Sequence, residues 1–371
     1  MKKTLLFLLA VVLMAACQND DTDFSAYTNG GGGTTTDAIN TIYITYNGTS
    51  ASKSGDDNGY VTIHGADVTV NTGTDTDSLL LVLNGSTTDG SLLVYRQKKY
   101  GIRLNGVSIT NQDGPALNNQ CGKSLYLEVA GGTTNSLSDG TTYAEQSYDQ
   151  KGALFSEGQI IFLGTGSLTV TGNCKHAIAC DDYIEFDEAT VSATTTTGNG
   201  IKVNDGIWIN GGTLDISTTA AAGRGIKCDS VVVVSGGNIT ISTTGDCTYD
   251  SDALDYSSAA CIKCDYDFQM TGGTLTMTSS GDGGKGLNSD AGVLVSGGSF
   301  SAITTGSNND AKPKAVKGTS ITVSGGSFYA EVDKSWACDN GSDSETPSDR
   351  ITIVGTPATS TVDKKLVNIV F

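Results

Sequence analysis

The chain has 371 residues, of which 48 are glycine, four are proline and 17% are charged. Strong helix formers are too scarce for a helical bundle, and the glycines follow no three-residue period, which excludes a collagen-like chain. Forty acidic against 22 basic residues give a formal net charge of −18. Phosphate backbones repel a chain this acidic, so we expect no nucleic-acid partner, whereas divalent cations and neutral ligands remain open.

The amino terminus has the pattern of an export signal. Lys2 and Lys3 precede an apolar run over residues 5–13, which is too short for an ordinary membrane span, and small residues lead to Cys17. We therefore predict a signal peptide over residues 1–16. The pattern resembles a bacterial lipoprotein signal, which implies that Cys17 becomes the lipidated first residue. An ordinary signal peptide with an incidental cysteine is the alternative.

Residues 17–40 are predicted to form a lipid anchor and flexible tether. A four-glycine run at 30–33 and the polar residues around it cannot bury a core. The Gln-Asn-Asp-Asp stretch at 18–21 resembles the acidic export tags of lipoproteins that some Gram-negative bacteria display outside the cell. This resemblance implies a surface-exposed outer-membrane lipoprotein, with outer-membrane lipid as a partner through acylated Cys17.

A phrase with a central Gly-Gly pair recurs through the second half of the chain. Its clear copies begin at Ile209, Val234, Met270, Val295 and Val323. An apolar residue, here called the anchor, precedes each clear or weaker copy, and the anchors are Leu154, Ile178, Ile201, Ile226, Ile262, Leu287 and Val316. They are 24, 23, 25, 36, 25 and 29 residues apart. Apolar and polar residues alternate within these intervals, which indicates short strands.

The repeat length predicts a solenoid. At about 3.3 Å per residue, roughly 24 residues pass once around a small three-sided prism, and successive turns stack their strands in parallel. The handedness rule for parallel crossovers favours a right-handed coil. We predict an all-β fold, a right-handed parallel β-helix of about 24 residues per turn, forming one domain over residues 41–371 with its clearest repeats at 151–332. Residues 43–70 are expected to form the first turn or a cap, and residues 351–371 should close the other end, because solenoid ends must cover open strand edges.

Three inward ladders should form the core of this coil. The first consists of the anchors. The second consists of Leu168, Val191, Leu214, Ile239, Leu275, Phe300 and Phe328. The third, two residues further on, consists of Val170, Ala193, Ile216, Ile241, Met277, Ala302 and Ala330. Three ladders in register over seven turns predict one continuous apolar interior.

Two outward columns follow from the same register. The lysine column, one residue after each anchor, is Phe155, Ala179, Lys202, Lys227, Lys263, Asn288 and Lys317. The acid column, three residues after each anchor, is Glu157, Asp181, Asn204, Asp229, Asp265, Asp290 and Thr319. Two carboxylates about 5 Å apart repel by roughly 3 kcal/mol at an effective dielectric of 20. Lysines, backbone N–H groups or a bound cation must therefore neutralise the acid column.

Calcium is the cation that this density of carboxylates predicts. Asp229 and Asp265 lie on the acid column, and Asp181 is followed directly by Asp182. The alternative is structural, because Asx turns and exposed salt bridges use the same residues and contribute little each.

The 36-residue interval contains a second acidic candidate. Its insertion carries Asp250, Asp252 and Asp255, together with Tyr249 and Tyr256. A long loop on a rigid solenoid is a common place for function, and this one could hold Ca²⁺, with the tyrosines as ligand contacts. A solvated acidic loop is the alternative, and Cys247 and Cys261 could close it as a disulfide.

Aromatic side chains matter for sugar binding because a pyranose packs its apolar face on a flat ring. Trp208 is expected to be exposed on an outward ladder beside Glu185, and a buried or capped indole is the alternative. The lysines of the column, Lys202, Lys227 and Lys263, are further candidates for ligand contacts. No catalytic constellation stands out, since the histidines share no repeat position and neither a nucleophile elbow nor an HExxH motif is present.

From about Leu125 onward the sequence resembles a known family. The resemblance lies in residues 134–140, 151–154 and 164–170 and in the repeated Gly-Ile-Lys-x-(Asp/Asn). These features resemble the calcium-binding, carbohydrate-binding β-helix proteins described as cellulose and pectin binders, which are structurally similar to family 9 polysaccharide lyases. The resemblance covers about two thirds of the chain.

The resemblance implies both a metal site and an alternative activity. In the lyases one acid, then an adjacent acidic pair one turn later and a fourth acid three residues on hold calcium. Glu157, Asp181, Asp182 and Glu185 match that spacing, with Glu in place of Asp at two positions. The lyase base is a lysine, and Lys227 or Lys202 is the nearest counterpart.

Three functions are therefore open. The first is a surface lipoprotein that binds a cellulose- or pectin-like polysaccharide without catalysis, with bound calcium. The second is a calcium-dependent lyase that cleaves polyuronates by β-elimination, with a lysine removing the proton next to the carboxylate. The third is a structural adhesin.

Overall fold

The computed structural model describes residues 39–55, 57–74 and 77–371. The predicted signal peptide, Cys17 and nearly all of the predicted tether lie outside the described residues, although strand β1 already begins at Asn40. The described chain is built from β-strands, with one short 3-10 helix, η2 (Pro347–Arg350). It contains no helix of the length and hydrophobicity that a membrane span requires.

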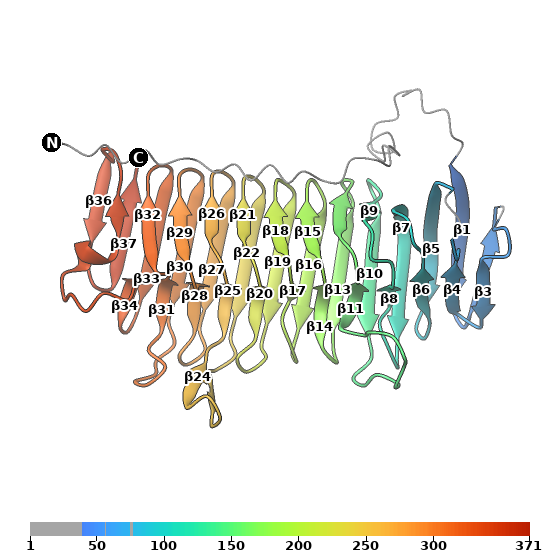
Figure 1. Cartoon of the computed structure of the whole chain (residues 1–371), viewed down its shortest axis with the longest axis horizontal. Helices are drawn as coiled ribbons and strands as arrows, with labels where there is room; N and C mark the ends of the chain where they lie inside the picture. Colours follow the sequence, from blue (N-terminus) through green and yellow to red (C-terminus); the bar gives the residue numbers. More distant parts are fainter. Residues whose placement is uncertain (1–38, 56, 75–76) are drawn as a thin grey trace. The chain divides into compact units, whose positions relative to one another are not determined.

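The strands stack as a parallel β-helix, which confirms the predicted fold (Figure 1). One face is a 12-stranded sheet, here called the anchor sheet because it carries the anchors. Its strands are β3 (Val61–His64), β4 (Asp67–Asn71), β6 (Ser91–Tyr95), β8 (Leu117–Asn119), β11 (Gly152–Ser156), β14 (His176–Cys180), β17 (Ile201–Val203), β20 (Arg224–Cys228), β25 (Ala260–Cys264), β28 (Lys285–Ser289), β31 (Lys314–Lys317) and β34 (Trp336–Asp339).

The other two faces belong to a 23-stranded sheet. The second face consists of β9 (Leu125–Val129), β12 (Ile160–Leu163), β15 (Tyr183–Phe186), β18 (Gly206–Ile209), β21 (Val232–Val234), β26 (Phe268–Met270), β29 (Gly292–Val295), β32 (Ser320–Val323) and β35 (Thr352–Ile353). The third consists of β10 (Thr134–Asp139), β13 (Ser167–Gly172), β16 (Thr190–Thr195), β19 (Thr213–Thr218), β22 (Asn238–Thr243), β27 (Thr274–Ser279), β30 (Ser299–Thr304) and β33 (Ser327–Val332).

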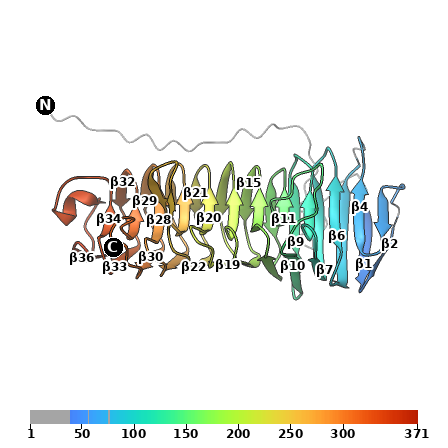
Figure 2. The same cartoon turned by 90° about the horizontal axis from the view of Figure 1, so that it is seen from below.

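The two faces join at the amino-terminal end. The long strand β7 (Tyr100–Asn111) pairs with β9 through its first half and with β10 through its second half. β5 (Leu79–Thr87) pairs parallel with β7, and β1 (Asn40–Asn47) pairs parallel with β5. Figure 2 shows the turns stacked from this end to the carboxyl-terminal end.

All three inward ladders are in the predicted register. The anchors pair from Leu154 to Val316 without a shift. The second and third ladders pair rung by rung to Phe328 and Ala330. These side chains are buried, and Phe300 and Phe328 stack with ring centroids 4.7 Å apart. The apolar alternation in the sequence therefore determines the core directly.

The Gly-Gly corners are tight because each turn passes close to the previous one. Gly237 has φ +80°, and a Cβ there would lie 2.7 Å from the carbonyl oxygen of Gly211 on the preceding turn. Only glycine fulfils both requirements, a left-handed backbone and close backbone approach. This explains why the phrase keeps its glycine pair from turn to turn.

Both ends are covered by antiparallel strands. At the amino-terminal end β2 (Ser50–Ser54) pairs with β1, and β3 pairs with β4. At the other end β37 (Leu366–Val370) pairs with β33 and with β36 (Thr359–Val362). The strands thus occur in the segments expected to be caps, and they change direction where parallel stacking stops.

The described cysteines are free thiols. Cys180, Cys228 and Cys264 are buried on one inward ladder, where they act as small apolar residues. A disulfide between Cys247 and Cys261 is not formed. The Cys261 thiol points into the core and donates to the Thr278 carbonyl oxygen at 3.2 Å, so it faces away from the insertion that it was expected to close.

Candidate functional site

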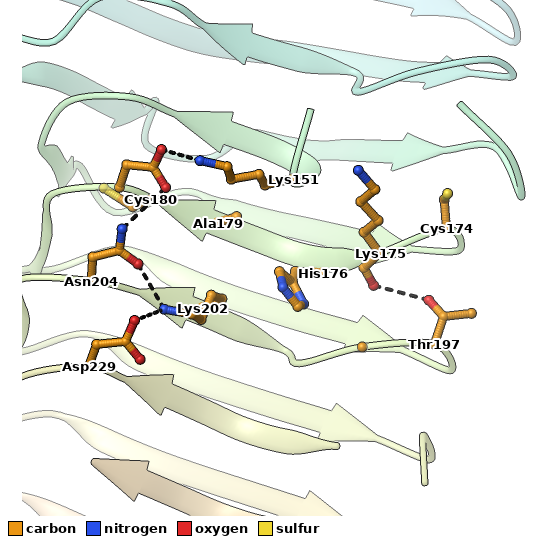
Figure 3. A pocket seen from close by; sticks show the side chains of 12 residues that line it. Lys151, Cys174, Lys175, His176, Ala179, Cys180, Thr197, Lys202, Asn204 and Asp229 are labelled. Carbon is orange, nitrogen blue, oxygen red and sulfur yellow. Dashed lines mark hydrogen bonds and ion pairs between the residues drawn. The ribbon is translucent and has the colours of Figure 1, made fainter. Parts of the chain in front are cut away.

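A groove of about 450 Å³ crosses the outer surface of the anchor sheet (Figure 3). It spans strands β11, β14, β17 and β20, and its lining includes Lys151, Lys175, His176, Ala179, Asp181, Thr197, Lys202, Asn204 and Asp229. Its depth comes from the lysine column. Ala179 stands in register between Phe155 on one side and Lys202 on the other, so one short side chain between two long ones leaves a hollow.

His176 lies at the centre of this groove, between Lys175 and Lys202 (Figure 3). Its Nδ1 accepts a hydrogen bond from the backbone N–H of Asn199 at 3.0 Å. Burial, reinforced by the nearby charges of Lys202 and Lys175, lowers the pKa of His176 to about 4. The ring is therefore neutral at physiological pH, and with Nδ1 accepting, its proton is on Nε2, which makes it a fixed donor.

Polar side chains surround the histidine. Lys202 donates to the Asn204 amide oxygen at 2.8 Å and forms an ion pair with Asp229 at 2.5 Å. Lys175 is exposed, and its ammonium lies 5.3 Å from the ring centroid of Tyr143. Fixed donors and acceptors of this kind match the hydroxyl groups of a sugar.

Three carboxylates converge next to the groove. Asp149, Glu157 and Asp181 each place a carboxylate oxygen within 4.8 Å of the others, and this is the one such metal-compatible group among the described residues. Lys151 is ion-paired with Asp149 at 2.6 Å and also with Asp181. Burial, together with the charge of Asp181, raises the pKa of Glu157. This local excess of negative charge is one that a divalent cation would relieve.

Of the four acids that the resemblance implies as calcium ligands, two lie in this cluster and two lie elsewhere. Glu157 and Asp181 meet as predicted, and Asp149 joins them, whereas Asp182 and Glu185 are not in the cluster. The Asp182 carboxylate accepts from the Gln159 amide and from the backbone N–H of Tyr183. Glu185 accepts from Asn210 at 2.7 Å on the second face.

The two outward columns are in the predicted register and form an alternating row. Lys227 contacts Asp229 of its own turn and Asp265 of the next, each at 2.7 Å. Lys263 continues the row to Asp265 and then to Asp290 at 2.5 Å. Although burial opposes them, the hydrogen bonds to Asp229 and Asp265 raise the pKa of Lys227 overall. The lysines of this row thus neutralise the aspartates of the acid column.

The insertion forms a small hairpin of β23 (Thr248–Asp250) and β24 (Asp255–Ser257), which projects below the coil in Figure 1. Asp250 caps its turn by accepting the backbone N–H groups of Asp252 and Ala253. Tyr249 is 55% exposed and packs edge-to-face on Tyr256, with ring centroids 5.1 Å apart. The tyrosines remain available for contact, whereas Asp250 serves the local turn.

Trp208 is half-buried rather than exposed as expected. Its indole packs edge-to-face on Tyr183 at 5.5 Å, and it covers Gly206, where an added Cβ would lie 2.6 Å from the ring. The glycine lets the indole fold down onto the strand. The neighbouring Glu185 is in register with it, as predicted, but both lie on the second face and not in the groove.

Sequence reasoning missed His176, Lys151, Lys175 and Asp149. The outward columns predicted from the sequence all lie after the anchor, whereas His176 lies two residues before it. Position −2 was the available signal, because it gathers His176, Arg224, Lys285, Lys314 and Trp336 on one side of the sheet.

One comparison with known proteins, the match to a family model, identifies a carbohydrate-binding domain. A family model described as "Carbohydrate-binding domain-containing protein" matches residues 64–331, well over half of the chain. Among solved structures, a polysaccharide lyase-like protein from C. thermocellum is similar, at 21% identity and a TM-score of 0.48, covering 70% of this chain and 92% of that chain. No curated protein matches.

Proposed function

From the premise that this chain belongs to the family of carbohydrate-binding domain-containing proteins, we propose that it binds a polysaccharide, without cleaving it, in the groove of the anchor sheet. The observation that carries the proposal is the groove itself. It is a preformed depression of about 450 Å³ with a neutral histidine donor at its centre and amide, hydroxyl and ammonium groups around it. A polar, preorganised groove suits an extended chain of hydroxylated rings.

Filling the groove without changing its charges tests this proposal. Ala179→Phe places on β14 the side chain that Phe155 already presents on β11, so the fold should tolerate it. We expect retention of polysaccharide to fall at least about tenfold, because the ligand loses its contact surface. Affinity electrophoresis through gels containing polygalacturonate, xylan or soluble glucans measures this, with melting temperature as the fold control.

The matched control is Asn288→Phe, which changes the same column on β28, two turns beyond β20, the last strand of the groove. Unchanged retention in Ala179→Phe, or an equal loss in the control, would reject the groove as the binding site.

We further propose that Asp149, Glu157 and Asp181 hold Ca²⁺ at the rim of the groove. Three carboxylates supply up to six oxygen ligands, which suits the six to eight that calcium takes. The donor set fits if the Lys151 ammonium gives up its place between Asp149 and Asp181. Bound Ca²⁺ would supply positive charge beside the groove, where Asp181 already contributes to the lining.

Calcium binding should raise the melting temperature. At 100 times the dissociation constant, a ligand of the native state adds about 2.7 kcal/mol of stability. Glu157→Gln should abolish the rise, and Asp250→Asn, in the other predicted acidic segment, should leave it intact. A calcium-dependent shift that survives in Glu157→Gln and disappears in Asp250→Asn would move the site to the hairpin. No shift in the wild-type protein would remove calcium from the proposal.

A lyase activity is the second candidate, and one observation bears on it. The lysines expected to act as the base are ion-paired, Lys202 with Asp229 and Lys227 with Asp229 and Asp265. Although burial opposes them, the hydrogen bonds of Lys227 raise its pKa, which favours its protonated form. The pKa of Lys285 instead falls to about 8, chiefly through burial and then through Lys317 and Lys314. Only 8% of Lys285 is exposed, so a substrate could not reach it directly. Unsaturated uronates, detected by absorbance on incubation with polygalacturonate and Ca²⁺, would establish the lyase.

We also propose that the protein is tethered to the outer membrane through acylated Cys17 and faces outward. Incorporation of labelled fatty acid that disappears in Cys17→Ser would support the anchor. Protease accessibility on intact cells would support the orientation, and full protection from protease would contradict it.

A further inference from the structure

A second pocket, of about 580 Å³, lies at the carboxyl-terminal end of the anchor sheet. Its charged lining comprises Lys312, Lys314, Lys334, Arg350, Lys364, Asp339 and Glu345. Five cationic side chains thus face two acidic ones, on a chain whose net charge is −18. Such a reversal of sign is costly to assemble without a compensating partner, because like charges at close range repel one another.

Both acidic residues of the pocket already form ion pairs. Asp339 pairs with Lys314 at 2.6 Å and with Arg350 at 2.5 Å, so one carboxylate serves two cations. Glu345 pairs with Lys364 at 3.2 Å. Lys312 and Lys334 are exposed and form no ion pair with any described residue. The pocket therefore holds a positive surplus that the ion pairs of the described residues do not neutralise.

Arg350 forms the rigid part of the pocket. It is 5% exposed, its guanidinium carbon lies 3.9 Å from the centroid of the Trp336 ring, and its Nη2 donates to the Ser344 carbonyl oxygen at 2.9 Å. Its Nε has no hydrogen-bond partner, although buried donors are normally satisfied. Lys364 covers the same indole, with its ammonium 4.4 Å from the ring centroid. The indole is 8% exposed and is too covered to stack on a sugar, so recognition here would be ionic.

The acid column ends where this pocket begins. Asp290 is its last acid, and the next turn places Thr319 at that position, so Lys317 has no counterpart of the kind that neutralises Lys227 and Lys263. The alternation of lysine and aspartate thus stops on β28, and unpaired cations collect on the turns that follow.

We propose that this pocket is a second binding site, which takes the anionic groups, carboxylate or sulfate, of an acidic polysaccharide. The inference rests on the proposed function for the class of ligand, and its residues and its test are independent of the groove. A site of this kind would add a second contact for a chain already held in the groove, which raises avidity where one polymer spans both.

The two tryptophans allow a local measurement. Trp208→Phe leaves Trp336 as the sole indole, so fluorescence reports this pocket alone. Dextran sulfate and polygalacturonate, titrated in the presence of a chelator, should each change the emission with saturation, and added NaCl should weaken the binding. A response to only one polymer identifies the group as sulfate or carboxylate. Neutral dextran should give no response. Co-sedimentation supplies the same affinities.

Charge-reversal variants test whether Lys312 and Lys334 contact the anionic polymer. Lys312→Glu and Lys334→Glu should each weaken binding of the anionic polymer about tenfold, since each removes a charged contact. Lys123→Glu, an exposed lysine far from the pocket, is the matched control and should bind as the parent does. Equal affinities for all three variants, or an equal loss in the control, would overturn the site. Ala179→Phe should keep the fluorescence response while losing retention, which separates failure of this site from failure of the groove.

Discussion

Lys227 illustrates how single charges behave on this surface. It lies between Asp229 and Asp265, and each of those aspartates also contacts a second lysine. Although burial opposes it, the hydrogen bonds from the lysines lower the pKa of both aspartates. Because the folded pKa is below the unfolded one, the resulting stability is present above about pH 4 and is lost as pH falls through the folded values.

Lys227→Met should therefore destabilise the protein in a pH-dependent way. We expect a loss of about 1 kcal/mol at neutral pH, kept small because Asp229 and Asp265 are more than a third exposed and water screens the pairs. The loss should shrink near about pH 3, where the aspartates become protonated. Urea unfolding at both pH values measures it. Lys175→Met, which removes no carboxylate pair, is the control, and a pH-independent loss would contradict the interpretation.

His176 illustrates the opposite case, a titratable group held neutral. Its pKa of about 4 keeps it uncharged throughout the physiological range. Polysaccharide retention in the groove should thus not depend on histidine protonation between about pH 5 and pH 8. A retention profile with a midpoint near the ordinary histidine pKa would contradict this assignment, and His176→Gln, which keeps a neutral donor, should retain more binding than His176→Ala.

At the scale of elements, the β23–β24 hairpin is an addition to the coil and not part of it. Strands β20 and β25, on either side of the insertion, pair directly with each other. The Tyr249–Tyr256 contact is internal to the hairpin. Lys285 lies near its base, donates to Ser258 and is buried there.

Replacing residues 249–256 with two glycines should leave the coil intact. The melting temperature should change by only a few degrees, since no core ladder is interrupted. The pKa of Lys285 should rise from about 8, because water would reach its ammonium. The pH dependence of amine acylation, followed by peptide mass mapping, measures this change. A midpoint that does not move would show that the hairpin has no part in burying Lys285.

At the scale of the whole molecule, self-association is controlled at the two ends of the coil, where parallel stacking stops. The β-helix buries its interior turn by turn, and each turn covers only its neighbours. At the carboxyl-terminal end β37 pairs antiparallel with β33, and Ile369 closes over Phe328. The cap therefore shields a strand edge that could otherwise pair with another copy of the chain.

Removing residues 355–371 should increase self-association relative to the full chain. The edge of β33 and the ring of Phe328 would be exposed together, which favours edge-to-edge pairing. Light scattering after size exclusion detects this. Adding Tyr329→Lys to the truncated chain places a charge on the open edge and should reduce self-association to the level of the full chain. A truncated chain that associates no more than the full chain would show that the cap contributes stability only.

Much of the fold was predictable because it repeats. Apolar residues at a spacing near 24 must face one interior, and period-two alternation determines which residues point out, so the ladders and the lysine and acid columns are confirmed residue by residue. Half of the expected acidic cluster, Glu157 and Asp181, also follows from that register.

The groove and its surroundings could not be predicted from the repeat, because they depend on residues that depart from it. Asp149 reaches the cluster from an irregular loop, Trp208 folds down because Gly206 has no side chain, and Ala179 forms a hollow only through the sizes of its neighbours on other turns. The sequence by itself determined the turn on which each repeated residue lies and whether its side chain points inward or outward, because both follow from the spacing of apolar residues. Depth, ion pairing and the sign of a pocket's charge are properties of side chains from several turns acting together, and only the tertiary structure decided them.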